Sequence, residues 1–300
     1  MPLIIITRVA PWLIWPACLL AHSGLVIAAA VLAPAVLSPL AAATAMALTL
    51  VLLVVEHWLP YRADWSVRGD AEIWRDLGHA VAYAGLAVNT SRLLFLVLVP
   101  RVLSLLPFAK RIALWPTTSP VWMQIAIVIV LGDLFEYLYH HAAHHRAFLW
   151  RLHAIHHTPV RLHTIKGARH HAGYALGRGV FVWLPLLFLG APPQLIVWQF
   201  IAVTITGLAA HANVAYRIPA LLHRVIVTPE FHRVHHADDP RLGTANLAAV
   251  LPVWDMLFGT HVDPLTVDVR DAGIRNDPIP RSFVAEMKWP LARRTPDAGA

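Results

Sequence analysis

The longest uncharged stretch of the chain is the feature that most limits how it can fold. No acidic residue, lysine or arginine occurs between Arg8 and Glu56. A membrane-spanning helix needs about 20 predominantly apolar residues, so this stretch is long enough for two such helices. Pro34 favours a turn between them. We therefore expect two membrane-spanning helices, at about residues 10–32 and 40–58.

The composition of the whole chain agrees with a membrane protein. Of the 300 residues, 58% are hydrophobic and 14% are charged, whereas about a quarter of the residues of an average soluble domain are charged. Two further apolar runs cover about residues 77–99 and 120–139. The sequence therefore predicts an all-α, polytopic membrane protein with about four full transmembrane helices.

Polar, histidine-rich segments follow the apolar runs. Residues 140–178 and 211–241 are rich in histidine and arginine. The apolar stretch between them, residues 179–210, is divided by Pro192-Pro193 into two pieces that are each short for a full span. We expect a short membrane hairpin there, inserted into a histidine-rich helical cap. The chain would then have three regions: transmembrane helices over residues 1–139, the cap with its hairpin over residues 140–262, and a C-terminal tail over residues 263–300.

The charge distribution predicts an orientation in the membrane. The 24 lysine and arginine residues give the chain a net charge of +7 over its 17 acidic residues. They are scattered between the apolar segments, which is typical of the flanks of membrane helices and argues against nucleic acid as a partner. The three polar segments 60–76, 140–178 and 211–241 share one side if the hairpin returns. Because that side holds most of the cations, the cap is expected to face the cytoplasm.

Cysteine and histidine are used very differently in this chain. Cys18 is the only cysteine, which excludes a disulfide framework, an iron–sulfur cluster and a cysteine-ligated zinc within one chain. The 19 histidines outnumber the 17 acidic residues, and 15 of them lie between His140 and His236. The histidines are therefore the candidates for chemistry.

Three histidine clusters have spacings that suit metal binding. His140 and His144 lie four residues apart and so share one face of a helix. Two copies of the pattern H-x-x-H-H follow, and the three clusters together hold eight imidazoles: His140, His144, His153, His156, His157, His232, His235 and His236.

The number of these imidazoles indicates two metal ions. Neutral imidazole is a good ligand for iron, zinc, copper and nickel. One structural zinc ion takes four ligands, so eight imidazoles suit two ions with three or four protein ligands each. The clusters contain hardly any carboxylate, unlike soluble di-iron bundles, whose ligands include several glutamates. We therefore interpret the cap as a catalytic di-metal unit.

Other histidines are expected to be structural. His141 and His145 occupy the opposite helix face from His140 and His144, so we do not expect them to bind metal. Isolated histidines elsewhere are also expected to have structural roles: His22, His57, His79, His223 and His261. Five polar residues near the clusters are candidates for orienting the ligand rings: Asp133, Glu136, Asn213, Asp238 and Asn246.

The clusters belong to longer motifs. These are L-W-R-x-H-x-x-H-H from Leu149 to His157, R-x-H from Arg169 to His171, H-A-N from His211 to Asn213, T-P-x-F-H-R-V-H-H from Thr228 to His236, and W-D-x-x-F-G-T from Trp254 to Thr260. Through these motifs, the chain resembles the fatty acid hydroxylase superfamily over about residues 56–262. That superfamily includes sterol-desaturase-like and alkylglycerol-monooxygenase-like members.

The resemblance implies a ligand set and a pair of metals. It implies two iron ions, which zinc can replace in purified protein, in a cap on the cytoplasmic side of a bacterial inner membrane. Two further family histidines match His171 and His211, so the implied metal ligands are His140, His144, His153, His156, His157, His171, His211, His232, His235 and His236. The chain departs from the family pattern at His141, where Arg is usual, and at Ala172, where Pro is usual. His163 and His170 are additional to the pattern.

The implied activity is oxidation of a lipid. The resemblance indicates an O2-dependent, non-haem di-iron hydroxylase or desaturase that acts on a membrane lipid such as a fatty acyl chain, a sterol or an ether lipid. The chain has no G-x-G-x-x-G fingerprint and no cysteines for an iron–sulfur cluster, so we expect a separate electron donor: a reductase, a ferredoxin or a cytochrome.

Two other classes of protein remain as alternatives. A histidine-rich membrane protein that binds or transports metal ions would need ionisable residues through the middle of the membrane, and the predicted spans carry few. A zinc-dependent membrane hydrolase would ordinarily use three metal ligands and a catalytic carboxylate. Eight clustered histidines exceed that requirement, so the lipid oxidase is the leading hypothesis.

Overall fold

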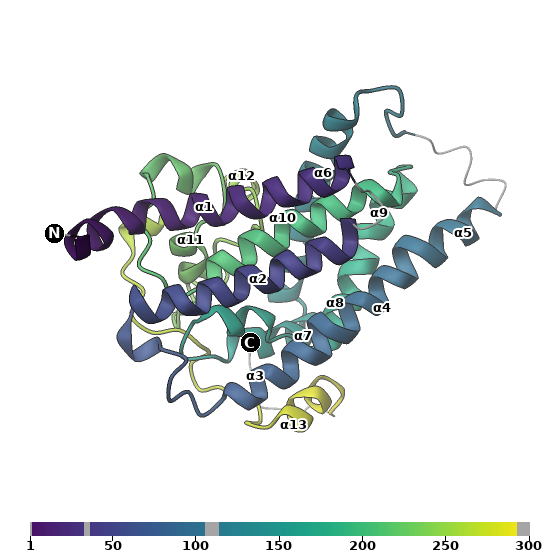
Figure 1. Ribbon diagram of the computed structural model, residues 1–300. Coiled ribbons are helices and arrows are strands. Elements are labelled where there is room, and N and C mark those ends of the chain that lie inside the picture. Colours follow the sequence, from purple (N-terminus) through teal and green to yellow (C-terminus); the bar gives the residue numbers. More distant parts are fainter. Residues whose placement is uncertain (1, 33–36, 106–113, 293–300) are drawn as a thin grey trace.

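The structure is a computed structural model that describes residues 2–32, 37–105 and 114–292. Within these residues the fold is all-α, and the only β pairing is two isolated bridges. Four long helices pack side by side: α1 (Pro2–Leu32), α2 (Leu37–Trp58), α6 (Val121–His145) and α10 (Pro193–His211). Helix α10 contacts α1, α2 and α6, and Figure 1 shows α1, α10 and α2 running alongside one another.

Residues 73–104 form another long helical segment. It consists of α3 (Ile73–Ala80), a π-helical turn (Val81–Ala87), α4 (Val88–Arg92), a second π-helical turn (Leu93–Leu98) and α5 (Val99–Ser104). In Figure 1 this segment runs diagonally from α3 to α5, which projects at the right.

Four helical segments in the described part of the chain are long and apolar enough to cross a membrane. They are Leu40–Trp58, Ile73–Ser104, Val121–His145 and Pro193–His211. The predicted number of about four is confirmed. Three of these segments correspond to predicted spans, and the fourth, Pro193–His211, is the second half of the expected hairpin, which reaches the length of a full span. Helix α1 covers the first predicted span, and its fully described part contains the apolar stretch Val9–Leu25. Pro34, which favours the first turn, lies outside the described residues.

Shorter helices lie in the rest of the chain. Within residues 140–262 they are α7 (Ala147–His157), α8 (Ala172–Arg178), a π-helical turn (Gly179–Trp183), α9 (Leu184–Phe188), α11 (Pro229–His235) and α12 (Val253–Phe258). Helix α13 (Phe283–Lys288) lies in the region predicted as the C-terminal tail. Short 3-10 turns lie at Ala63–Trp65, Thr164–Ala168, Ala220–Arg224, Pro264–Thr266 and Trp289–Leu291.

The helix that carries the last histidine cluster begins where its sequence dictates. Thr228 is the N-cap of α11, and its side-chain oxygen accepts a hydrogen bond from the backbone N–H of Phe231. Pro229 occupies the first turn, where its missing N–H costs nothing. The N-cap is therefore fixed four residues before His232.

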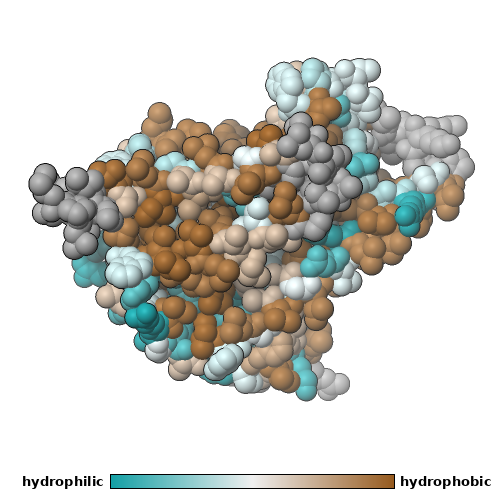
Figure 2. All heavy atoms as spheres, viewed as in Figure 1, coloured by the Kyte–Doolittle hydropathy of each residue, from teal (hydrophilic) through white to brown (hydrophobic). Residues whose placement is uncertain are grey.

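The outer face of the long helices is apolar. Leu50, Val54 and Trp58 of α2 are among many large hydrophobic side chains that are exposed on the described surface. Figure 2 shows apolar residues covering much of the face formed by α1 and α2. Soluble monomers rarely expose such large contiguous apolar areas. Together with the four spans, this surface is that of an integral membrane protein.

Candidate metal centre

The structure gathers nine histidines into two adjoining groups. The first group contains His140, His144, His153, His157 and His235, and the second contains His156, His211, His232 and His236. Within each group, one ring nitrogen of every member lies within 4.8 Å of those of the others. His144 and His232 are half-buried, and the other seven are buried.

Each H-x-x-H-H motif is divided between the two groups. In helix α7, His153 and His157 belong to the first group, whereas His156 belongs to the second. In and just after α11, His232 and His236 belong to the second group, whereas His235 belongs to the first. Residues i and i+4 share a helix face, and residue i+3 lies on the adjacent one. The motif therefore places two ligands in one group and one in the other.

The long helices supply the other members. His140 and His144 lie in the last two turns of α6, and His211 is the last residue of α10. The histidine groups therefore sit at the ends of two helices that are long enough to cross a membrane.

Backbone carbonyl groups fix the orientation of three rings. The Nδ1 atoms of His140, His211 and His235 lie 2.6, 2.7 and 2.9 Å from the carbonyl oxygens of Leu247, Gly207 and Ala245. A carbonyl oxygen only accepts, so each Nδ1–H must donate. In the neutral ring, Nε2 then carries a free lone pair, which is the form that binds a metal.

Several ring nitrogens lie close to one another, and a bound cation would accept their lone pairs. In the second group, Nε2 of His211 lies 3.2 Å from Nε2 of His156 and 3.1 Å from Nε2 of His232. Several buried ring nitrogens have no hydrogen-bond partner among the described residues: Nε2 of His144 and His235, and Nδ1 of His153, His156 and His236. Buried polar atoms are rarely left unpaired. A set of neutral imidazole nitrogens suits iron or zinc, so these residues fit the metals that the sequence implies.

Burial keeps these imidazoles neutral. It lowers the pKa of His153, His156 and His157 well below the ordinary value, and the neighbouring imidazoles lower it further. The same two causes lower the pKa of His232, His235 and His236. At neutral pH the rings are therefore ready to bind metal without losing a proton.

Two aspartates hold the loop whose carbonyl groups orient His140 and His235. Asp133 accepts hydrogen bonds from the backbone N–H groups of Val250 and Leu251, at 2.9 and 2.8 Å, and from the indole of Trp254. Asp255 accepts from the backbone N–H groups of Leu247 and Ala248. The carbonyl groups that fix His140 and His235 belong to the same loop. Asp133, a predicted orienting residue, therefore acts through the backbone, and Asp255 was not predicted.

Asn246 belongs to the same support. Its side chain donates to the carbonyl oxygens of Phe231 and Val262 and accepts from the N–H of Val262. Its φ of 55° is in the left-handed region, which asparagine tolerates better than most residues. Asn246 therefore joins helix α11 to the loop that follows it.

Among the described residues, the other three predicted orienting residues form no hydrogen bond with a histidine ring. Glu136 accepts a hydrogen bond from Arg178 at 2.9 Å, inside the helical bundle. Asn213 exchanges hydrogen bonds with the backbone of Arg62. Asp238 lies 3.8 Å from Arg275. Backbone carbonyl groups, rather than these side chains, orient three of the nine rings.

His171 is the one predicted ligand that the structure places outside both groups. Its Nδ1 accepts a hydrogen bond from the N–H of Gly173 and so caps helix α8, while its Nε2 lies 3.0 Å from the carbonyl oxygen of Met287. The preceding residue, His170, takes the inward position. Its ring stacks on that of His156, with centroids 3.9 Å apart. The family motif indicates His171, and no sequence signal marked His170 as the neighbour of the site.

The histidines expected to be structural lie outside the two groups. His141 and His145 stack on each other at 4.1 Å. His79 pairs with Glu286 at 2.6 Å, and His223 lies 2.7 Å from the hydroxyl of Thr228. His223 therefore supports the cap of helix α11.

A third cluster of possible ligands already holds a cation. Asp70, Asp76 and His163 lie close enough together to bind a metal ion. However, the ammonium group of Lys166 lies 2.8 Å from Asp70 and 2.6 Å from Asp76, so it pairs with both carboxylates of the cluster. Arg169 joins the same network through Asp76 and through Glu286 of helix α13. This network anchors the described part of the C-terminal tail to α3.

Comparisons with known proteins agree with these features. The sequence model of the fatty acid hydroxylase family matches residues 125–260, a range that contains all nine histidines of the two groups. Ornithine lipid hydroxylase OlsE of Rhizobium tropici is 29% identical over 249 residues, which cover 81% of this chain and 73% of that protein.

More distant similarity extends to enzymes named alkylglycerol monooxygenase. The Caenorhabditis elegans protein is 30% identical over 51% of this chain, and the Danio rerio protein is 27% identical over 49%. The matched region spans 30% and 31% of those two proteins. No solved structure matches the chain.

Proposed function

The chain belongs to the fatty acid hydroxylase superfamily, and from this premise we propose that it is a membrane-bound di-iron oxygenase that hydroxylates a lipid. It would use O2 and electrons from a separate donor. The observation that carries the proposal is the pair of adjoining, all-histidine groups at the ends of α6 and α10.

The donor sets support two metal ions. The first group offers five imidazoles and the second offers four, so each ion can be held and still leave a position for O2 or substrate. Iron bound there would supply the redox chemistry needed to oxidise an unactivated C–H bond. In purified protein zinc can compete for the same nitrogens.

The residues of the chain hold the site and exclude water from it. Helices α7 and α11 bring the ligands together, and the carbonyl groups of Leu247, Gly207 and Ala245 orient three of them. Aromatic rings border the first group: Tyr174 stacks on His153 at 4.8 Å, and Trp150 lies 5.2 Å from His144. Such an enclosed site protects reactive species from water.

The relatives favour hydroxylation of a lipid with a polar headgroup. Ornithine lipid hydroxylase aligns over most of both chains, whereas alkylglycerol monooxygenases align over about half of this one. Both names describe oxygen insertion rather than desaturation. We therefore rank a polar membrane lipid above a sterol as the substrate class.

The setting of the reaction is proposed from the charge pattern. We place the chain in a bacterial inner membrane with the histidine groups on the cytoplasmic side. A reductase, ferredoxin or cytochrome would dock there to deliver electrons. The metal-transport and hydrolase alternatives have less support, because the groups gather at helix ends and contain no carboxylate ligand.

Metal content and labelled oxygen together test this function. Protein made with ample iron should contain two iron ions per chain, one for each histidine group. Lipids of a deletion strain and its complemented strain should differ by a hydroxylated lipid, and that lipid should carry the label when cells grow with isotopically labelled O2. A single bound ion after careful iron supply, or a product without label, would overturn the proposal.

A further inference from the structure

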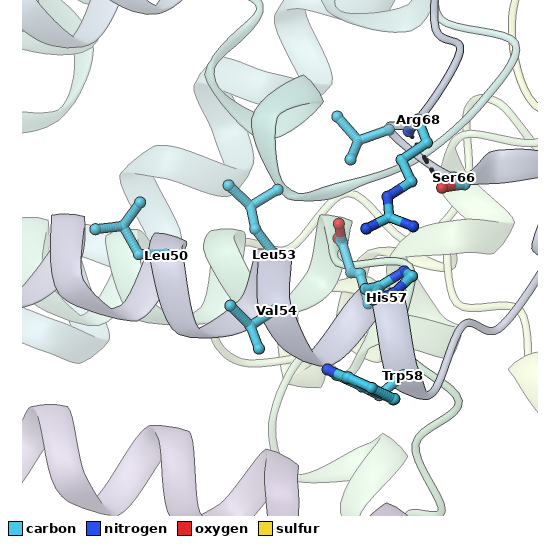
Figure 3. A pocket seen from close by; sticks show the side chains of 9 residues that line it. Leu50, Leu53, Val54, His57, Trp58, Ser66 and Arg68 are labelled. Atoms are coloured by element: carbon cyan, nitrogen blue, oxygen red, sulfur yellow. Dashed lines mark hydrogen bonds between the residues drawn. The ribbon is translucent and has the colours of Figure 1, made fainter.

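A cavity lies at the end of α2, outside the two histidine groups. It has a volume of about 430 Å³ and is lined by residues from the last turns of α2 and from the loop at residues 66–68. Ligand pockets typically have about 300–1,000 Å³ and combine apolar walls with a few polar groups. Figure 3 shows the two sides of this pocket, with α2 below and the loop above.

One wall of the pocket is apolar and continuous with the membrane-facing surface. Leu50, Leu53 and Val54 line it from α2, and Val54 is 60% exposed. Trp58 closes the same end of the helix and is 74% exposed. Tryptophan is enriched where membrane helices meet water. The pocket therefore opens at the boundary between the bilayer and the aqueous phase.

The opposite wall carries a positive charge. The guanidinium group of Arg68 points toward His57 in Figure 3. Its backbone N–H is hydrogen bonded to the Ser66 hydroxyl, but no carboxylate of the described residues lies within ion-pair distance of the guanidinium. A surface arginine in this setting is suited to a phosphate or carboxylate of a lipid headgroup.

Glu56 forms the floor of the pocket, and one of its carboxylate oxygens has no hydrogen-bond partner among the described residues. Glu56 is 5% exposed, and its Oε1 accepts hydrogen bonds from the N–H and hydroxyl of Thr164 and from the N–H of Asn213. Its Oε2 is buried and has no partner among the described residues. A buried carboxylate oxygen left unpaired is costly, and a donor placed in the pocket would satisfy it.

We propose that this pocket binds a zwitterionic aminolipid of the surrounding membrane. The anionic oxygen of the headgroup would pair with Arg68, the primary ammonium would donate to Oε2 of Glu56, and an acyl chain would lie along Leu50 and Val54. The positive charge of Arg68 and the negative charge of Glu56, which both line the pocket, match the two charges of such a headgroup, whereas an anionic lipid would leave Glu56 unpaired.

Lipid in the pocket would also stabilise the metal cap. Glu56 holds the backbone N–H of Asn213, two residues after His211, and the backbone of Thr164. Anything that binds the folded protein alone raises its stability. The pocket is therefore a lipid site distinct from the metal centre but connected to it through one carboxylate.

Lipid retention by the purified protein tests this site. Protein in detergent is mixed with phosphatidylethanolamine, phosphatidylcholine or phosphatidylglycerol of the same acyl composition, and bound lipid is counted by native mass spectrometry. Phosphatidylcholine has no N–H donor, and phosphatidylglycerol has no ammonium. We expect phosphatidylethanolamine to be retained most and to raise the melting temperature most.

Matched variants assign the binding to the pocket. Arg68→Gln should lower retention of phosphatidylethanolamine about tenfold, through loss of a charge-assisted contact. Arg270→Gln should not change it, because that side chain is 81% exposed and pairs with Asp268 on the surface. Equal retention of the three lipids, or an Arg68→Gln protein that binds like the wild type, would overturn the proposal.

A second variant tests the floor of the pocket. Glu56→Gln keeps an acceptor for Thr164 and Asn213 but removes the charge that would face the ammonium, so the preference for phosphatidylethanolamine over phosphatidylcholine should disappear. If the Glu56→Gln protein does not fold, the retention of phosphatidylethanolamine by Arg68→Gln still tests whether the lipid binds in this pocket. The binding measurement needs no iron, O2 or turnover, so its failure is distinguishable from failure of the proposed oxygenase function.

Discussion

His156 and His235 hold the same position in two copies of one motif, and each belongs to the histidine group that is completed by the other copy. His156 of α7 lies with His232 and His236, whereas His235 of α11 lies with His153 and His157. The two helices are therefore interlocked through their ligands. Metal binding at either group should stabilise the arrangement in which the histidine rings of α7 meet those of α11.

The sizes of the two histidine groups predict unequal effects of removing His156 and His235. His156→Ala leaves three imidazoles in the second group, whereas His235→Ala leaves four in the first. Four ligands suffice for a tetrahedral site, so we expect His156→Ala to lose about half of the bound metal and His235→Ala to lose less. Metal analysis of proteins purified in parallel measures this difference.

The control for these variants is His145→Ala. His145 lies on the outer face of α6 and stacks on His141, so its removal should leave the metal content unchanged. A loss of metal from His145→Ala equal to that from His156→Ala would contradict the division of histidines described above.

Asp133 should tune metal affinity without contacting a metal. Its two oxygens accept from the N–H groups of Val250 and Leu251, and in Asp133→Asn an amide NH2 would face one of these donors. The loop that carries the Leu247 carbonyl would shift, and His140 would lose its fixed orientation. We expect metal affinity to fall about tenfold or more, as measured by competition with a chelator.

Asp238→Asn is the matched control for this change. Asp238 is close to His236 in sequence, but its carboxylate lies near Arg275 rather than near a ligand. An equal loss of metal affinity in both variants would show that the negative charge near the site, rather than the position of the loop, sets the metal affinity.

The cluster of Asp70, Asp76 and His163 should contribute stability rather than a third metal ion. Lys166 already provides the cation, so Asp70→Asn should leave the metal content unchanged. Removing one partner from a buried ionic network typically costs about 3–5 kcal/mol, and thermal or denaturant unfolding would report that loss. A fall in metal content without a change in stability would contradict this assignment.

Glu72 of the same network makes a pH-dependent contribution to stability. Burial by itself would raise its pKa, but the bonded guanidinium of Arg75 and the charges of Arg169 and Lys166 outweigh it and lower the pKa to about 2. The folded pKa is below the unfolded one, near 4.5, so the stabilisation is complete above about pH 4.5 and is lost as pH falls toward 2.

The difference between wild type and Glu72→Gln isolates this effect. We expect the wild type to be the more stable protein at pH 6 and the gap in unfolding free energy to narrow as the pH is lowered below about 4.5. A gap that stays constant over that range would mean that Glu72 stabilises the fold by packing rather than by charge.

Much of the fold and of the ligand set could be predicted because both follow simple periodicities. Uninterrupted apolar runs mark spanning helices, and spacings of three and four residues mark a helix face. Nine of the ten predicted ligands lie together in the structure. The division of each motif between two groups could not be predicted, because it depends on how the histidine rings of α7 and α11, which are far apart in sequence, meet in the fold.

Other features depend on contacts that leave no sequence pattern. Three of the rings are oriented by backbone carbonyl groups, which every residue possesses, so nothing in the sequence distinguished Leu247 or Ala245. His171 matches the family motif, yet its ring caps α8 while the adjacent His170 turns toward His156. A shift of one residue in a loop is decided by tertiary packing rather than by local sequence.

Glu136 and Arg178 provide the last prediction, which concerns the interior of the helical bundle. The two side chains are each 7% exposed and are joined by a hydrogen-bonded ion pair of 2.9 Å between α6 and α8. Removing one partner leaves the other charge buried without compensation, so Glu136→Leu should cost about 3–5 kcal/mol of stability. The double variant Glu136→Leu/Arg178→Leu removes both charges and should recover a large part of that loss.

Unfolding in detergent and metal analysis, applied to both variants, separate a structural role from one in the metal site. Among the described residues, neither side chain forms a hydrogen bond with a histidine of the two groups, so the folded double variant should bind metal like the wild type. A double variant no more stable than Glu136→Leu would contradict the ion-pair argument. A stable double variant that has lost its metal would instead place Glu136 in support of the metal centre, since packing alone would have been restored.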